Sequence, residues 1–126
     1  MSETSLPPCG PARDRLVAEL LGWTAVGMER DHRHTECVDF GVAPGDSHRK
    51  PIPSYSTSDA DALAALKAWK AKTQGSVNII LDSAPDAAFV ALEDFEGDVL
   101  LYANRPTLAD AATAALVRWR NERSAT

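Results

Sequence analysis

Residues 51–72, PIPSYSTSDADALAALKAWKAK, constrain the fold more than any other stretch of this chain. Prolines stiffen its beginning, and Ser58 followed three residues later by Asp61 resembles the capping box that begins a helix. Three lysines gather toward its C-terminal half, where a helix dipole favours positive charge. The apolar residues that recur at helical spacing are Ala62, Leu63, Leu66 and Trp69. We therefore predict an amphipathic helix that Gly75 ends.

Two further helices are predicted, one before and one after this stretch. The first covers residues 11–21, begins with a proline and has Gly22 just past its end, as helix termini commonly do. The second covers residues 108–120 and follows Thr107, which forms with Asp110 a second capping signal of the same kind. The helical part of the fold is therefore spread along the whole chain.

Residues 57–70 and 107–120 resemble each other. Both contain a hydroxyl cap, several alanines and a Leu-x-x-Trp sequence followed by a basic residue. A duplication would explain this likeness, and so would the convergence of two amphipathic, alanine-rich helices on the same requirements.

Five segments have the composition of β-strands and fall into two groups. Residues 24–28 and 36–42 precede the central helix, and residues 77–81, 88–93 and 98–103 follow it. In the segment 88–93, apolar residues occupy alternate positions, so one face of that strand is apolar. The short connections within each group favour antiparallel pairing.

The predicted fold class is therefore α+β, with an antiparallel sheet of about five strands covered by three helices in the order α-β-β-α-β-β-β-α. With 126 residues, the chain is long enough for one hydrophobic core. We predict a single domain over residues 11–123. Residues 1–10, which are polar and contain two adjacent prolines, are predicted to be a disordered leader.

The charge and the cysteine content exclude several classes of protein. A formal net charge of −5 argues against broad nucleic-acid binding and against binding to an anionic membrane, because both need a basic face. Two cysteines do not make a disulfide framework, and neither a signal peptide nor an apolar run of membrane-spanning length is visible. We expect a cytoplasmic protein with free thiols.

Four segments carry a resemblance to a known family: RLVAELLGW, PSYSTSDADALAALKAW, VALEDFEGDVLLYA and TLADAATAALVRWR. From about Arg13 onward, the chain resembles the phage ABA-sandwich domain family, which consists of small proteins of phages and prophages. The resemblance implies a phage or prophage origin, with the host cell cytoplasm as location, and a helix/sheet/helix architecture. It implies no activity and no catalytic residue.

Nitrogen and sulfur donors that are able to bind a metal lie close together in the predicted first hairpin. They are His32, His34 and Cys37, and Cys9 or His48 would complete a set of four. The paired cysteines of structural zinc sites are absent, so the segment is equally consistent with a solvated turn. No Gly-x-Ser-x-Gly sequence occurs either, and we predict no metal, no cofactor, no catalytic residue and no enzyme activity.

The predicted helix N-termini are the better candidates for a binding site. Free backbone N–H groups, hydroxyls and the positive end of the helix dipole together favour an anion there. Residues 43–55 form a long, proline-rich loop before the central helix, and loops of this length are usually functional or disordered. The predicted ligand-binding residues are Arg49, Lys50, Tyr55, Ser56, Thr57, Ser58, Arg105 and Trp23, with the aromatic rings available to stack on a base. The alternative is that the hydroxyls only cap the helix.

Two functions from different classes follow. The first is a non-enzymatic, phage-derived accessory protein that binds a small anionic ligand of the nucleotide type as a homo-oligomer. A cyclic nucleotide or an ADP-ribose-type signal of host defence would be such a ligand, and binding would sequester it; this part rests on the phage resemblance. The alternative is a protein–protein interaction module that inhibits a host enzyme.

Overall fold

The computed structural model describes residues 6–30, 37–81, 88–93 and 100–124, and the statements below concern these ranges. The helices are α1 (Pro11–Leu20), α2 (Asp59–Thr73) and α3 (Leu108–Ser124). The strands are β1 (Thr24–Arg30), β2 (Cys37–Val42), β3 (Lys50–Pro51), β4 (Ser76–Leu81), β5 (Ala88–Glu93) and β6 (Leu100–Arg105). The predicted α+β class is confirmed, and the predicted order of elements holds except for the short strand β3.

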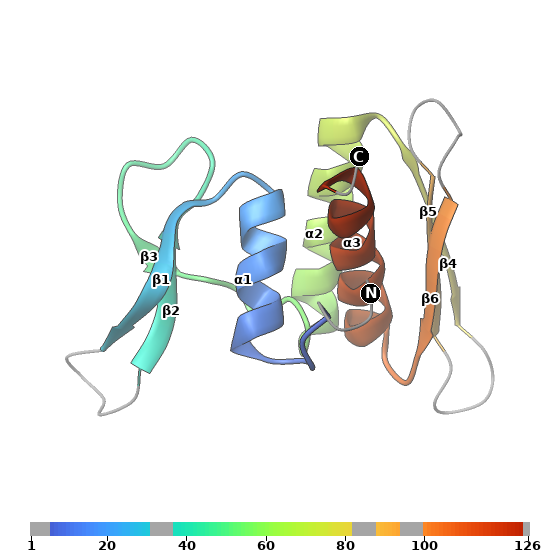
Figure 1. Ribbon diagram of the computed structural model, residues 1–126, viewed down its shortest axis with the longest axis horizontal. Coiled ribbons are helices and arrows are strands. Elements are labelled where there is room, and N and C mark those ends of the chain that lie inside the picture. The colour runs from blue at the N-terminus through green and yellow to red at the C-terminus, as the bar shows by residue number, and fades with distance from the viewer. Residues whose placement is uncertain (1–5, 31–36, 82–87, 94–99, 125–126) are drawn as a thin grey trace.

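The strands form two separate sheets, each of which is an antiparallel meander. The first sheet has the order β1-β2-β3 and the second the order β4-β5-β6. The prediction of one sheet with about five strands is therefore wrong. Figure 1 shows the reason, because the three helices stand between the two sheets and keep them apart. Local patterns predict which strands pair within a meander, but they do not say whether two meanders share an edge.

The three helices run in the same direction, because contacts join their starts and also their ends. At the starts, Arg13 of α1 pairs with Asp110 of α3 at 2.6 Å, and the carboxylate of Asp59 in α2 accepts a hydrogen bond from Ala109 N. At the ends, Lys72 Nζ of α2 donates to the carbonyl of the last α1 residue at 2.7 Å. The aligned dipoles thus meet carboxylates at one end and a lysine at the other, which is the favourable arrangement.

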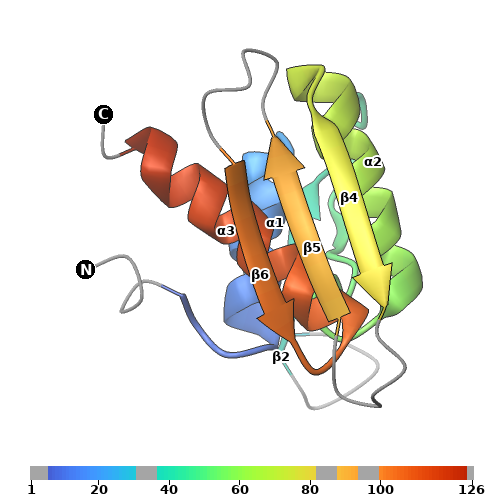
Figure 2. The same cartoon turned by 90° about the vertical axis from the view of Figure 1, so that its right-hand side faces the viewer.

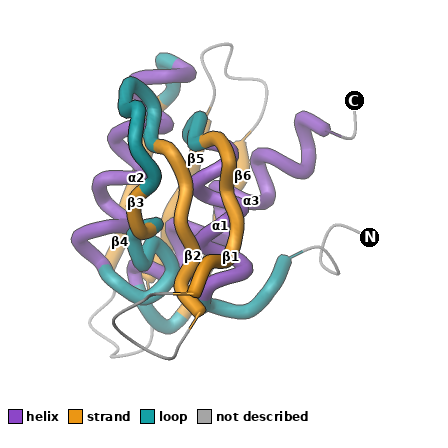
Figure 3. Tube along the Cα trace, turned by 90° about the vertical axis from the view of Figure 1, so that its left-hand side faces the viewer, coloured by secondary structure: helices purple, strands orange, loops and turns teal. Residues whose placement is uncertain are grey.

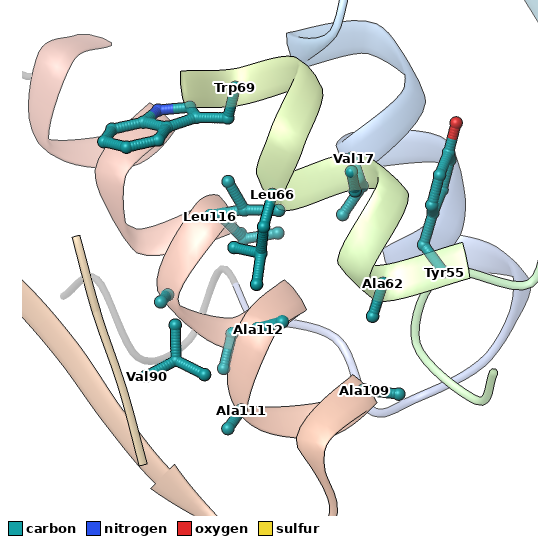
Figure 4. Packing of buried hydrophobic residues seen from close by; sticks show 14 of the residues in the cluster. Val17, Tyr55, Ala62, Leu66, Trp69, Val90, Ala109, Ala111, Ala112 and Leu116 are labelled. Atoms are coloured by element: carbon teal, nitrogen blue, oxygen red, sulfur yellow. The ribbon is translucent and has the colours of Figure 1, made fainter. Parts of the chain in front are cut away.

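The helix α3 lies at the centre of the molecule and contacts α1, α2, β5 and β6. We predicted one apolar stripe on it, whereas residues 111–117 are buried throughout, with neighbours on nearly every side. Their alanines let the neighbouring elements approach closely. Figure 4 shows how Leu116 of α3 meets Leu66 of α2 in this core, and Val90 faces α3 from β5. Trp69 and Trp119 pack edge to face, with ring centroids 5.7 Å apart.

The helix ends follow local backbone rules, with one correction. Gly22 has a φ of 101° just after α1, as predicted for a residue past a helix end. At the end of α2, however, Gln74 and not Gly75 adopts the left-handed conformation, with a φ of 57°. Gly75 is required for a different reason, because a Cβ there would lie 2.5 Å from Glu93 O and 2.7 Å from Trp69 Cη2.

The predicted loop 43–55 contains the short strand β3, which pairs with β2 (Figure 3). Its second residue is a proline, so composition gave no strand signal there; proline is tolerated because β3 is an edge strand. In the predicted leader, residues 6–10 are held against the helices. Pro7 O accepts a hydrogen bond from Arg13 Nε at 2.9 Å, and Gly10 N donates to Ser56 Oγ at 2.8 Å.

Candidate functional site

Three of the predicted site residues come together beside the start of the first sheet. The turn at Gly22 places Trp23 where it is buried, and Lys50 Nζ lies 5.8 Å from the centroid of the Trp23 ring. Tyr55 is also buried; it comes shortly before α2 and lines the same pocket as Trp23. Trp23, Lys50 and Tyr55 thus form one aromatic cluster with a single cation placed over it.

These two aromatic rings form part of a pocket of about 160 Å³. The lining residues are Leu21, Trp23, Pro44, Pro53, Tyr55, Asp61, Ala64, Ala65 and Ala68. We call this the Trp23–Tyr55 pocket. Its walls are largely apolar, and the proline rings come from the segments on either side of β3, whereas the alanines come from α2. The long loop of the sequence therefore closes one side of a cavity against a helix.

The hydroxyls that were predicted to bind an anion are engaged in internal hydrogen bonds. Ser56 is buried; its Oγ accepts from Gly10 N, and its backbone N donates to Asp14 Oδ1 at 2.8 Å. Ser58 Oγ accepts from the backbone N–H of Asp61 at 3.3 Å, so it caps α2. Thr57 is exposed at the turn between them. Two of the three hydroxyls thus have structural roles.

The N-terminus of α2 also carries negative charge of its own. Asp59 accepts a hydrogen bond from Ala109 N at 3.0 Å, and Asp61 accepts one from the backbone N of Ser54 at 3.0 Å. Two carboxylates therefore occupy the end of the helix where the dipole would favour an anionic ligand. Asp61 in addition lines the Trp23–Tyr55 pocket. This charge opposes binding of an anion at that point.

The predicted cations do not all reach the pocket. Arg49 and Lys50 point to opposite faces of the first sheet, since successive side chains of an extended segment alternate. Lys50 lies over Trp23, whereas Arg49 Nη1 donates to Ala25 O at 2.7 Å and lies beside Gly27. Arg105 is the last residue of β6, in the second sheet. Lys50 itself forms an ion pair with Asp46 at 2.8 Å.

Burial changes the acidity of two side chains near these elements. Burial raises the pKa of Tyr55 above 10.0, and the hydrogen bond with Trp23 offsets part of this rise. The Tyr55 hydroxyl therefore stays protonated at neutral pH. Partial burial likewise raises the pKa of the Cys9 thiol, although the nearby Arg13 guanidinium acts in the opposite direction. A thiol with a raised pKa is a poor nucleophile.

Sequence reasoning missed the apolar half of the site. Pro44 and Pro53 were noticed only as loop residues, and Ala64 and Ala68 only as helix filler, although together they build the pocket walls. The sequence signal for them is the spacing of Ala64 and Ala68, which are four residues apart and so lie on one side of the predicted helix, after a proline-rich loop. A larger groove of about 530 Å³ lies between α1 and β1, and it too was not predicted.

The metal hypothesis concerns residues that lie partly outside the described ranges, since His32 and His34 fall within 31–36. Within the described ranges, no group of three or more His, Cys, Asp or Glu residues is placed to hold a metal ion. The helices in those ranges are likewise too short or too polar to cross a membrane.

Comparisons of the chain with protein-family models, with curated proteins and with solved structures found no match. The resemblance to the phage ABA-sandwich family therefore stays a prediction from the sequence.

Proposed function

We propose that this protein is a protein–protein interaction module, and that the Trp23–Tyr55 pocket receives one apolar side chain of the partner. The observation that carries the proposal is the size and chemistry of the pocket. Its volume of about 160 Å³ lies below the roughly 300–1,000 Å³ of ordinary small-molecule sites. A cavity of this size, with aromatic and proline walls, suits a single side chain better than a nucleotide.

The surroundings of the pocket support the same function. Ala64 and Ala68 are exposed on α2, and because their side chains are small, a partner chain is able to approach the helix closely there. Trp23 and Tyr55 are both buried and line the pocket together, and aromatic residues are enriched at the centres of protein interfaces. Asp61 makes the rim acidic, which disfavours an anionic ligand and favours a partner with positive charge beside its apolar anchor.

One observation supports the nucleotide-type ligand as a second candidate. Lys50 lies over Trp23, so a base in the pocket would have a cation nearby for its phosphate. Two observations argue against a nucleotide-type ligand: Lys50 is already paired with Asp46, and two carboxylates lie at the start of α2. The phage origin, the host-defence signal, the inhibited host enzyme and the homo-oligomer stay predictions from the sequence.

The proposed function is tested by selecting ligands from a random-peptide library and measuring their binding to two variants. Ala68→Leu fills the pocket from an exposed helix position, and leucine is a good helix former. Ala60→Leu makes the same change at an exposed position that does not line the pocket, so it is the matched control.

We expect the selected peptides to bind wild type and Ala60→Leu equally and Ala68→Leu at least about tenfold more weakly, the effect of losing a buried side chain from its pocket. Equal binding to all three proteins would refute the role of the pocket. Selection of no peptide, together with pocket-dependent binding of a nucleotide, would favour the second candidate.

A further inference from the structure

A second surface, independent of the Trp23–Tyr55 pocket, lies at the edge of the second sheet. The strand β4 pairs with β5 on one side, and no described strand pairs with its other side. Its sequence, SVNIIL, contains none of the lysines or prolines by which proteins usually protect an exposed edge. The outer edge of β4 therefore presents backbone N–H and C=O groups that are able to pair with another strand.

Apolar side chains are exposed beside this edge. Among the described residues, the exposed large hydrophobic side chains are Leu63 of α2, at 37%, and Ile79 of β4, at 38%. Ile79 pairs with Val90, which is buried against α3, so Ile79 belongs to the face of the sheet that looks toward the helices. Because Ile79 is nevertheless exposed, the helices do not fully cover this face of the sheet at the outer edge of β4.

The exposed side of α2 that accompanies β4 is basic. Leu63, Lys67, Lys70 and Gln74 recur at intervals of three and four residues, so they form one stripe along the helix. The C-terminal part of this stripe, Lys67, Lys70 and Gln74, lines a groove of about 390 Å³ together with Gly75, the residue before β4. Within the described ranges, neither Lys67 nor Lys70 has a carboxylate partner.

We propose that the outer edge of β4 binds an extended segment of a partner protein as a fourth strand of the second sheet. The side chains of this segment that face the helices are apolar at one end and acidic at the other. Strand addition satisfies the free backbone groups of β4. Every second side chain of the added strand points toward the helices. Of these, the apolar ones lie next to Leu63 and Ile79, and the acidic ones meet Lys67 and Lys70. The side chains in between point to the opposite face of the sheet, away from α2, so both kinds of contact come from every second residue.

Shape and charge both argue against a second copy of this chain as the occupant. Figure 2 shows that α2 lies behind β4 and extends past its free edge. If two β4 strands paired around a two-fold axis, both α2 helices would project over the same seam and bring four lysines together. An added single strand has no such helix and offers the opposite charge.

The experiment measures fluorescence anisotropy with two labelled peptides, Val-Thr-Val-Thr-Glu-Thr-Glu, called the acidic peptide, and Val-Thr-Val-Thr-Lys-Thr-Lys, called the basic peptide. In both, the valines and the charged residues occupy every second position and so face the helices together. Wild type is compared with Lys67→Glu/Lys70→Glu, which reverses the charge at two exposed positions. We expect wild type to prefer the acidic peptide by about tenfold, as two partly exposed ion pairs would give, and the variant to prefer the basic peptide by a similar factor. Because the variant must gain a ligand, misfolding cannot produce this result.

Amide chemical shifts in β4 are expected to change on addition of the acidic peptide to wild type. An unchanged preference in the variant, no binding of either peptide, or shifts confined to other elements would overturn the proposal. Sedimentation of the protein alone adds one further outcome. A dimer that Ile79→Lys converts to a monomer would assign the edge to a second copy and refute the partner segment.

Discussion

Replacing Arg13 by methionine tests how the helix starts are held together. The Arg13 side chain is 4% exposed and that of Asp110 is 18% exposed, and their charged atoms are 2.6 Å apart. Arg13 also donates to Pro7 O and to Thr113 Oγ1, at 2.9 and 3.3 Å. Methionine fills a similar volume but leaves the carboxylate of Asp110 without its cation.

Breaking a buried ion pair in this way costs about 3–5 kcal/mol, whereas a domain of this size is stable by only about 5–15 kcal/mol. In urea denaturation with a slope of about 1.5 kcal/mol/M, Arg13→Met is therefore expected to lower the midpoint by about 2–3 M. Lys70→Met, at an exposed position, is the control and should change the free energy of unfolding by less than about 0.5 kcal/mol.

The double variant Arg13→Met/Asp110→Leu distinguishes loss of the pair from loss of packing. It removes both charges, and replacing a whole buried pair by apolar residues is often close to neutral. We expect it to recover most of the stability that Arg13→Met loses. A loss below about 1 kcal/mol in the single variant, or no recovery in the double variant, would refute the structural role given to this pair.

Three further predictions concern single residues. Gly75→Ala should destabilise by about 1–3 kcal/mol in urea, because the new Cβ would clash with the backbone of Glu93, which is unable to move aside as a flexible side chain does; a neutral result would contradict this packing. Ser58→Ala should cost about 1 kcal/mol through loss of the cap, and a loss well above 2 kcal/mol would show another role. Since the folded pKa of Tyr55 is raised above 10.0, its contribution to stability is fully present below pH 10 and is lost as the pH rises through the folded pKa. Tyr55→Phe should remove this part of the alkaline destabilisation, and an unchanged pH profile would count against the buried phenol.

Much of the fold was predictable because its signals are local. Ser58 and Gly22 mark helix ends through the backbone groups next to them. The short apolar segment of β5 marks a strand, although its predicted alternation does not match the structure, where Glu93 is the exposed residue and Ala91 is buried as well as Val90 and Leu92. The separation of the meanders into two sheets was not predictable, because it depends on where three helices pack. The ion pair of Arg13 and Asp110 joins residues that are 97 positions apart, so no local sequence pattern predicts it.

The candidate site was predicted only in part, for a similar reason. Trp23, Lys50 and Tyr55 are among the predicted ligand-binding residues, and the structure brings these three together. The hydroxyl of Ser56 looked available in the sequence, but tertiary contacts with Gly10 and with the α1 carboxylate engage the residue. Arg49 was grouped with Lys50 because they are neighbours in sequence, and the extended backbone there sends them to opposite faces.

The central claim is that the Trp23–Tyr55 pocket binds an apolar side chain, and the indole N–H signals in NMR spectra test it most directly. The chain has three tryptophans, and Trp→Phe variants assign the signals of Trp23, Trp69 and Trp119. N-acetyl-leucinamide and N-acetyl-prolinamide are the apolar probes, and AMP is the anionic one. We expect a saturable shift of the Trp23 signal with an apolar probe, while the buried pair Trp69 and Trp119 stays unchanged. A Trp23 signal that no probe shifts, or that only AMP shifts, would contradict the account.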